Sequence, residues 1–459
     1  MEIDLANRIA RACLAQFEKL PKTGKPNESF EWTILSAIVL ERRVSTPNAT
    51  SDIRVVALGT GTKCLAGNEL SSRGDRVNDS HAEVLARRAF VRYLLEQIEH
   101  TLDGQERESV FERQGETFVL KSGHSFHFFT THSPCGDASI FGEKEDEIER
   151  PTKRARLETE EVNGCVVGMT GGKLLEPEEH GDLMAQTIGA VRTKPGRGVR
   201  TLSVSCSDKL ARWNVLGVQG SLLMMLLARP IYLESVVLCD GTNCSVEAIR
   251  RAIWGRFDRW AGVGEAEEKK LMLEPFQRNQ PSIIVANGGD MFKYRKNRQL
   301  ASGEGGKYQP SPGGIVWCDV AKRPHEVEVA GRRHGVTKRQ LATPAARLQI
   351  SKIELFNRFA RTYARWLAGD TKHPREALHN LAPTALDATH PTKTVDAEAG
   401  DDGPATVGKL SYTDAKARSG RYVAQWAIVR DTMFGRWTVK PSGLGQFFID
   451  ADEAGKMGH

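Results

Sequence analysis

The chain lacks the long apolar runs that cross a membrane. No stretch of about 18 or more consecutive apolar residues occurs in its sequence. The first residues, Met1-Glu2-Ile3-Asp4, show neither the basic start nor the apolar core of a secretory signal. We therefore expect an intracellular protein, in the nucleus, the cytoplasm or both, that is not secreted.

Cysteine is also scarce. The 459 residues include eight cysteines, spread irregularly from Cys13 to Cys318. This spacing does not suit the disulfide framework of a secreted domain. We expect reduced thiols, which are free to bind a metal or to pack in a core.

The charge balance excludes little. The formal net charge is +6 and 40% of the residues are hydrophobic, as in many globular proteins. A mild excess of lysine and arginine permits a nucleic-acid partner without requiring one. Residues 151–156 form a basic cluster that resembles a nuclear-import signal, although such runs are more often simply solvated.

Apolar patterning predicts alternating helices and strands. Helices are expected over residues 3–20, 80–102, 206–216, 246–257, 345–367 and 412–436, and strands over 53–58, 126–131, 231–238, 282–286 and 314–318. The run 32–40 fits a buried helix or a strand equally well. We expect one domain over 1–459, with flexible insertions at 143–163 and 370–408.

Residues 81–83 read His-Ala-Glu at the predicted start of the second helix. Ser80 and Glu83 have the spacing of a capping box, with Ser80 as the N-cap. A histidine and a glutamate at this spacing can serve a metal and a proton transfer together. An ordinary helix cap explains the pair equally well until further ligands are found.

Two cysteines stand where thiolates are favoured. Cys135 follows the aromatic strand 126–131, and we expect it at a helix start, where peptide dipoles stabilise a thiolate. Ser205 and Asp208 repeat the capping-box spacing, which places Cys206 in a first helical turn. Taken singly, each is more simply a buried structural cysteine.

His81, Cys135 and Cys206 together form a candidate zinc site. A catalytic zinc takes three protein ligands and keeps one position for water. Glu83 would then pass a proton from that water to a leaving amine. Small zinc deaminases place both cysteines in one P-C-x-x-C motif. Here Ala138 occupies the second position, so Cys206 must supply that thiolate.

These motifs resemble the signature of the editing-type RNA adenosine deaminases, which is HAE, PCG and SCSDK in this order. The matching segments are residues 81–83, 134–136 and 205–209, and the resemblance runs from about residue 30 to 450. It implies an α/β fold: a cytidine-deaminase-like three-layer core with a mixed central sheet flanked by helices, enlarged by a helical C-terminal part. It also implies that His81, Cys135 and Cys206 bind Zn²⁺ and that Glu83 is the catalytic proton shuttle.

Residues 194–198 and 351–356 resemble the branch of this family that acts on tRNA. That branch hydrolytically converts the adenosine next to the anticodon of alanine tRNA, position 37, to inosine. The loop before Cys206 is shorter than in messenger-editing relatives, which suits a base that is already unpaired. We expect no membrane contact and no obligate protein partner. RNA contacts are expected at Thr62, Lys63, Arg192, Arg197 and Arg200.

The resemblance further implies a buried inositol hexakisphosphate. Such a ligand explains Arg88 on an otherwise apolar helical stripe, because an unpaired buried charge is costly. The matching positions are Asn78, Arg87, Arg88, Lys209, Arg212, Lys352, Tyr412, Lys416, Tyr422, Trp437 and Lys440. Asp79, Lys194 and Lys209 are expected to form a polar relay from this ligand to the metal. The chain departs from messenger-editing relatives at Trp426, Val439 and Gly445, which leaves the peripheral contacts open.

Two other functions compete with this reading. A messenger or double-stranded-RNA editase is disfavoured by the short loop and because the catalytic fold uses nearly all of the chain. A catalytically inactive RNA-binding or inositol-phosphate-binding module is disfavoured because Glu83 and all three metal ligands are present.

Overall fold

The computed structural model describes most of the chain. The described residues are 2–43, 50–140, 161–162, 165–166, 191–194, 201–239, 244–260, 270–287, 292–296, 308–368, 410–435 and 437–450. The predicted insertion at 370–408 lies outside them, as does the predicted insertion at 143–163 apart from residues 161–162. Among the described residues, no helix has the length and apolar character needed to cross a bilayer.

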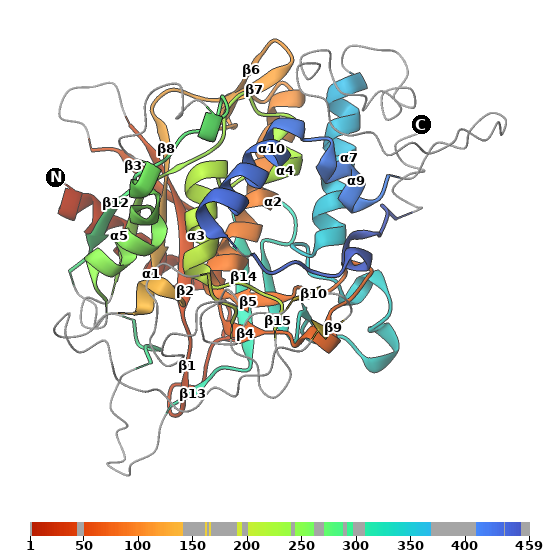
Figure 1. The fold of residues 1–459 in the computed structure, drawn as a ribbon. Coiled ribbons are helices and arrows are strands. Elements are labelled where there is room, and N and C mark those ends of the chain that lie inside the picture. Colours follow the sequence, from red (N-terminus) through yellow and green to blue (C-terminus); the bar gives the residue numbers. More distant parts are fainter. Residues whose placement is uncertain are drawn as a thin grey trace.

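A mixed eight-stranded sheet forms the centre of the molecule (Figure 1). Its strands, in spatial order, are β12 (Ser282–Val285), β11 (Leu233–Leu238), β8 (His124–Thr130), β2 (Leu35–Arg42), β3 (Asp52–Thr60), β14 (Gly313–Cys318), β15 (His325–Val329) and β16 (Arg332–Arg333). β11 pairs in parallel with β12 and β8, whereas the other neighbours are antiparallel. The ambiguous run 32–40 therefore contributes mainly to a strand, and the mixed sheet is confirmed.

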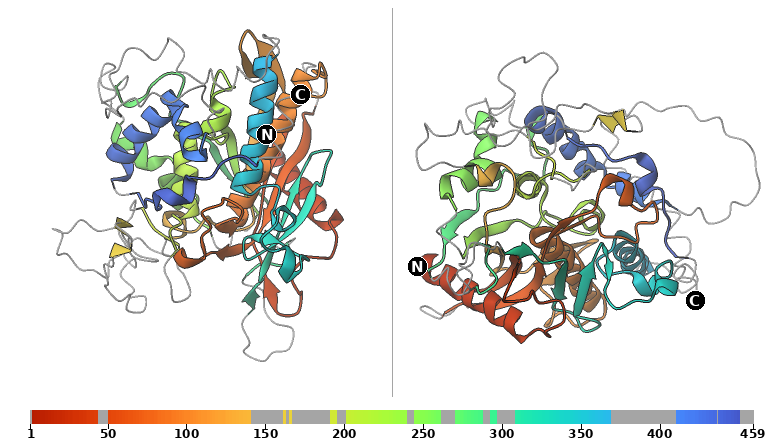
Figure 2. Two further views of the ribbon diagram at one scale, coloured as in Figure 1. Left: turned by 90° about the vertical axis from the view of Figure 1, so that its right-hand side faces the viewer. Right: turned by 90° about the horizontal axis from the view of Figure 1, so that it is seen from below.

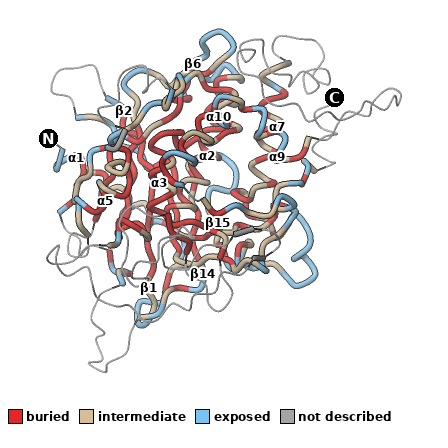
Figure 3. Tube along the Cα trace, in the orientation of Figure 1, coloured by how far each residue is buried: buried red, intermediate tan, exposed pale blue. Residues whose placement is uncertain are grey.

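Helices cover both faces of this sheet. α1 (Glu2–Lys19) contacts one face and α2 (Ala82–Leu102) contacts the other. Side chains alternate along β2 because successive strand residues point to opposite faces. Leu35 and Val39 pack in the cluster that contains α1, whereas Ile38 and Leu40 pack in the cluster that contains α2. The predicted three-layer core is confirmed, and Figure 3 shows its sheet and α2 as largely buried chain.

A second group of helices extends the α2 side. These are α3 (Cys206–Leu216), α4 (Ser221–Met224), α5 (Val246–Ile253), α7 (Lys352–Ala368), α9 (Tyr412–Ala417) and α10 (Gly420–Val429). α7 packs on α2, and α10 contacts α3, α4 and α9. Figure 2 shows α10, in blue, beside the yellow-green α3, and α7, in light blue, beside the orange α2. The predicted helical C-terminal part is confirmed.

Short strand pairs complete the described fold. They are β1 (Glu31–Trp32) with β13 (Gln309–Pro310), β4 (Thr62–Cys64) with β5 (Asp79–His81), β6 (Phe111–Gln114) with β7 (Thr117–Leu120), and β9 (Glu161–Val162) with β10 (Cys165–Val166). Of these, β4 and β5 matter most for the site, because β5 carries His81 to the start of α2.

The predicted capping box at Ser80 is wrong. Residues 79–81 pair with β4 as strand β5, and the Ala82 N–H donates to the Gly61 carbonyl at 3.0 Å. The backbone is thus held extended through His81, which becomes the N-cap without a side-chain cap bond. The tertiary pairing of β5 overrides the local capping preference.

The predicted helix start at Cys135 is also wrong. Cys135 lies in a loop, and within the described residues up to 140 it is followed by a single 3₁₀ turn, Asp137–Ser139. Gly136 between them has φ +101° and ψ −141°, which is incompatible with a helix. The thiol is therefore not at the end of an α-helix.

Two C-terminal helices differ from their predicted bounds. The last one is not continuous over 412–436: Ser419 (φ −79°, ψ 61°) separates α9 from α10, and a π-helical turn, Arg430–Phe434, follows α10. Gly435 ends that turn at φ +62°. α7 begins at Lys352 rather than 345, because Arg347 is extended after a short 3₁₀ turn.

Candidate active site

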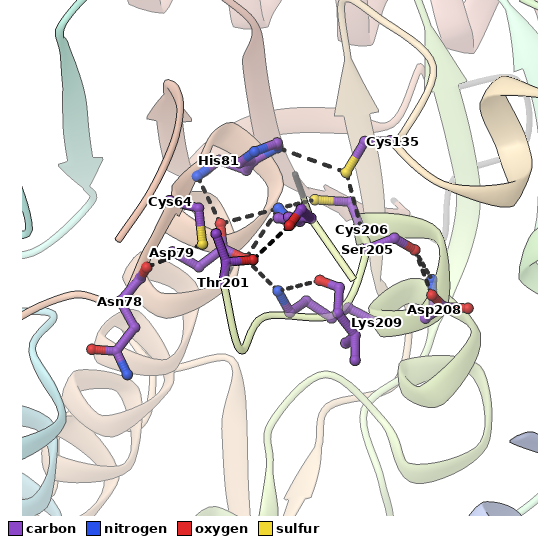
Figure 4. Close-up of polar contacts among 12 residues, drawn as sticks. Cys64, Asn78, Asp79, His81, Cys135, Thr201, Ser205, Cys206, Asp208 and Lys209 are labelled. Atoms are coloured by element: carbon purple, nitrogen blue, oxygen red, sulfur yellow. Dashed lines mark hydrogen bonds and ion pairs between the residues drawn. The ribbon is translucent and has the colours of Figure 1, made fainter. Parts of the chain in front are cut away.

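Three metal-binding side chains meet at one point from distant parts of the chain. His81 ends β5, Cys135 lies in the loop after β8, and Cys206 opens α3. Their ligand atoms lie within 4.8 Å of one another, and His81 Nδ1 is 3.8 Å from Cys135 Sγ (Figure 4). The predicted split between two separate cysteine segments is confirmed.

The two cysteine segments are fastened directly to each other. Ser207 Oγ donates to the Cys135 carbonyl at 2.9 Å and accepts from the Ala138 N–H at 3.1 Å. The segments approach closely at Gly136, where an added Cβ would lie 2.3 Å from Ser205 Oγ. Only glycine permits this contact, which explains the small residue after Cys135.

The donor set suits zinc. One imidazole nitrogen and two thiol sulfurs are ligands that zinc prefers, and three protein ligands leave a position for water. The Cys206 backbone N–H also donates to Cys135 Sγ at 3.3 Å. The pKa of Cys135 is held well below its ordinary value chiefly by a hydrogen bond from the Cys206 side chain, which outweighs the effect of burial. A thiolate at Cys135 is the form that binds a metal.

Glu83 is buried beside these ligands and stands apart from the surrounding hydrogen bonds. It is 1% exposed, and neither carboxylate oxygen has a hydrogen-bond partner within the described part of the chain. Burial raises its pKa. An unpaired buried carboxylate is costly to stability, so this one is explained by chemistry and not by packing.

A chain of charged contacts leads away from Cys206. Lys194 is 1% exposed and its Nζ lies 3.0 Å from both Cys206 Sγ and Asp79 Oδ1. Lys209 Nζ contacts the same Asp79 carboxylate and the Val204 carbonyl. Although burial opposes it, the two lysines hold the pKa of Asp79 far below its usual range. The structure thus brings together the three residues of the predicted relay.

The relay ends at two adjoining cavities of about 180 and 250 Å³. Both are lined by Arg87, Arg88, Arg212 and Lys352. The lining includes all eleven predicted inositol-phosphate positions: Asn78, Arg87, Arg88, Lys209, Arg212, Lys352, Tyr412, Lys416, Tyr422, Trp437 and Lys440. Asp79 is the single acidic residue among the lining side chains that the structure describes.

These cationic side chains are poorly neutralised by the residues around them. Burial, then the repulsion of Lys440, lowers the pKa of Lys352 to about 7. Burial likewise lowers the pKa of Lys440 to about 8 and that of Arg88 to about 10. Arg88 Nη2 is buried without a hydrogen-bond partner among the described residues. The cavities therefore concentrate positive charge that the described residues do not neutralise.

Trp426 has a role at one position where the chain departs from its messenger-editing relatives. Its ring lies 3.8 Å from the Arg212 guanidinium carbon, and the Trp437 ring lies 5.9 Å from it. Aromatic faces attract a guanidinium group at such distances. Trp426 thus stabilises the cavity cation Arg212 through its ring, at a position where those relatives carry another cation.

The residues predicted to contact RNA differ in where the structure places them. Thr62 and Lys63 lie in β4, with Thr62 directly across from His81. Arg192 is only 4% exposed, and its backbone N–H donates to Asp208 Oδ2 at 3.0 Å, so it belongs to the interior and not to an RNA-facing surface. Arg197 and Arg200 lie outside the described residues.

Sequence reasoning overlooked Arg251 and Arg256. They contact Asp137 and Asp208, which follow Cys135 and Cys206 by two residues each. The shared Cys-x-Asp spacing was the available signal. It carried no weight alone, because the arginines come from a third segment whose position the sequence does not show.

Comparison with known proteins agrees with this geometry. Residues 57–441 match the family model described as the adenosine-deaminase (editase) domain. The chain is 36% identical to "tRNA-specific adenosine deaminase 1" of Drosophila melanogaster, with 96% of each protein covered. It is 32% identical to the protein of that name from Homo sapiens, over 96% of this chain and 99% of the relative. "Double-stranded RNA-specific editase Adar" of Drosophila melanogaster is 33% identical over 62% of this chain and 39% of its own length. The chain therefore belongs to the adenosine-deaminase (editase) family.

Proposed function

We propose that this protein is a zinc-dependent hydrolase that converts adenosine to inosine in tRNA, at position 37 next to the anticodon of alanine tRNA. The observation that carries the chemistry is the buried, unpartnered Glu83 carboxylate beside His81, Cys135 and Cys206. The tRNA substrate is supported by relatives named for tRNA, which match 96% of the chain.

Glu83 is the proton carrier in this proposal. A zinc ion held by the three ligands would lower the pKa of water and activate it for attack on the adenine amidine carbon. The Glu83 carboxylate accepts the proton of the attacking water and donates it to the exocyclic amine, which leaves as ammonia. Burial suits the first step, because its raised pKa makes Glu83 a better base than an exposed carboxylate.

Lys194 has a separate task. Its Nζ lies 3.0 Å from Cys206 Sγ and thus places a positive charge beside a thiolate ligand. The charge limits the electron density that this sulfur donates and favours its thiolate form, against the burial that raises the pKa of Cys206. Asp79 holds the lysine in this position from its other side.

We assign the adjoining cavities to inositol hexakisphosphate. Phosphate groups accept charge-assisted hydrogen bonds from arginine and lysine, which are stronger than neutral ones. The ligand would neutralise Arg87, Arg88, Lys352 and Lys440, whose pKa values burial otherwise lowers. Its role is structural, because the cationic walls repel one another without it. We also propose that the chain forms one domain, that it acts inside the cell, and that it needs no protein partner.

Treatment of transcribed alanine tRNA with the purified protein tests this function. We expect inosine at position 37 and nowhere else in the molecule, detected by sequencing of the product. A long RNA duplex serves as the contrasting substrate. Editing of the duplex with the tRNA left unchanged would replace the proposal with a messenger-type editase, and no inosine in either RNA from zinc-loaded protein would reject both.

A further inference from the structure

A buried group of charged residues lies behind the two cysteines, and the mechanism above does not use it. Asp137 and Asp208 each stand two residues after a cysteine ligand, and both are 0% exposed. Figure 4 shows Asp208 beside Ser205, next to Cys206. Each carboxylate receives an arginine from the segment formed by α5 and the following 3₁₀ helix, Gly255–Trp260.

Arg251, near the end of α5, holds the Cys135 loop. Its Nε lies 3.3 Å from Asp137 Oδ2, and its Nη2 donates to the Asp137 carbonyl at 2.9 Å. The same Nη2 donates to the Ile140 carbonyl at 2.8 Å. One guanidinium thus binds a side chain and two carbonyls of the short turn that follows Cys135, which fixes the shape of that turn.

Arg256 lies between the two carboxylates. Its Nη1 donates to Asp208 Oδ1 at 2.9 Å, and its Nη2 lies 3.9 Å from Asp137 Oδ2. The Arg256 side chain is 5% exposed. The other Asp208 oxygen, Oδ2, accepts from Ser205 Oγ at 2.6 Å and from the Arg192 N–H at 3.0 Å. Arg256 therefore joins the first turn of α3, through a hydrogen bond to Asp208, to the Cys135 loop, through a charge contact with Asp137.

Stability does not explain this arrangement. Desolvating several charges costs about as much as their attraction returns, and apolar side chains of the same volume often do as well. What an arginine adds is geometry, because its planar guanidinium can face two carboxylates at once, here with a hydrogen bond to Asp208 and a longer charge contact of 3.9 Å to Asp137. Here those carboxylates belong to the segments that carry the two sulfur ligands.

We propose that Arg256 is a positioning residue that sets the separation of the Cys135 and Cys206 sulfurs and so controls how tightly the site retains zinc. The inference rests on the zinc ligands of the proposed function. It extends that function by making a segment with no metal ligand, residues 251–256, a determinant of metal retention. Arg251 contributes by holding one of the two segments that Arg256 joins.

The rate of zinc release to an excess chelator tests this assignment without any RNA. Loss of a group that orients metal ligands typically costs about 10- to 100-fold in affinity. We expect Arg256→Met to release zinc about 10- to 100-fold faster than the unaltered protein. Arg256→Lys should fall between the two, since an ammonium group can hold one carboxylate but not span both.

Arg358→Met is the matched control. Arg358 is another largely buried arginine, paired with Glu96 at 2.8 Å and with Glu99, but it joins α7 to α2. Its loss should lower the unfolding temperature and leave zinc release unchanged. If Arg256→Met releases zinc at the unaltered rate, or Arg358→Met speeds release equally, the positioning role is wrong.

Asp208→Asn keeps the assignment testable should Arg256→Met fail to fold. It removes the charge that Arg256 holds and preserves the shape, so zinc release should again accelerate, whereas an unchanged rate would reject the assignment. In the double variant of Asp208→Asn with Arg256→Lys, zinc release should accelerate by less than the two single effects combined, because both substitutions break the same contact. Full additivity would contradict the proposal. Zinc retained without any deamination of tRNA would reject the proposed function alone, since release can still be compared among these variants.

Discussion

The metal site and the cationic cavities treat buried charge in opposite ways. Around the cysteines each charge meets its counterpart within the chain: Lys194 meets Asp79, and Arg256 meets Asp208. In the cavities Asp79 is the one acidic residue among the described lining side chains, which include several arginines and lysines, and the pKa of Lys352 falls to about 7. Paired charges hold the cysteine segments in position, whereas charges without a counterpart among the described residues imply a ligand that the chain does not itself supply.

Glu83 is the exception within the matched region, and its loss gives the largest expected effect. Glu83→Gln should lower the deamination rate by about 10²- to 10⁴-fold, the usual contribution of a general acid–base group. Zinc content should stay complete, because His81, Cys135 and Cys206 are intact. Single-turnover kinetics and metal analysis on the same sample check both statements. A variant that retained its activity would remove Glu83 from its role.

Removing a cavity cation should destabilise the protein when the polyanion is bound and stabilise it when the polyanion is absent. Lys352→Met should destabilise the inositol-hexakisphosphate-loaded protein by about 1.5–3 kcal/mol, through loss of a charge-assisted contact. The same change should stabilise ligand-free protein, because it relieves the repulsion of Lys440 and Arg88. Chemical denaturation with and without the ligand measures both. Lys338→Met, at an exposed position, is the control and should change neither state.

The pH dependence of stability should separate the ligand-free from the loaded protein. The pKa of Lys352 is lowered to about 7 and that of Lys440 to about 8, from an ordinary 10.5. Between those values and 10.5 the unfolded chain binds more protons than the folded one, so the stability of ligand-free protein rises with pH across this window. Each group contributes up to about 1.4 kcal/mol per pH unit.

A bound polyanion keeps these lysines charged and should remove that rise. Denaturation midpoints between pH 7 and pH 10 test the difference. A rising stability in protein saturated with inositol hexakisphosphate would show that the ligand does not reach Lys352 and Lys440, and would contradict its assignment to these cavities.

The smallest expected effect concerns Trp426. Trp426→Leu removes an aromatic face that lies 3.8 Å from the Arg212 guanidinium carbon. A cation–π contact of this kind is worth about 0.5–2 kcal/mol. We expect a loss in that range, seen as a lower unfolding temperature together with weaker retention of the polyanion. Trp426→Tyr should recover most of it, and an equal loss in both variants would point to packing instead.

Some features followed directly from local sequence. Strand β8 is dense in aromatic and β-branched residues, and its burial follows from that composition. α3 begins at Cys206, as the Ser205–Asp208 cap predicts, because a capping bond needs only residues three apart. Local rules failed where distant pairing intervened, as at Ser80, which β4 draws into a strand.

By itself the sequence determined the chemical identity of the site: one histidine, two cysteines and a glutamate, together with an excess of cations spread along several helices. Only the tertiary structure decided that the ligand atoms of His81, Cys135 and Cys206 lie within 4.8 Å of one another, that Glu83 has no hydrogen-bond partner among the described residues, and that Arg256 stands between Asp137 and Asp208. Ligand type is a property of single residues. Distance, burial and charge balance belong to segments that meet only when the chain folds.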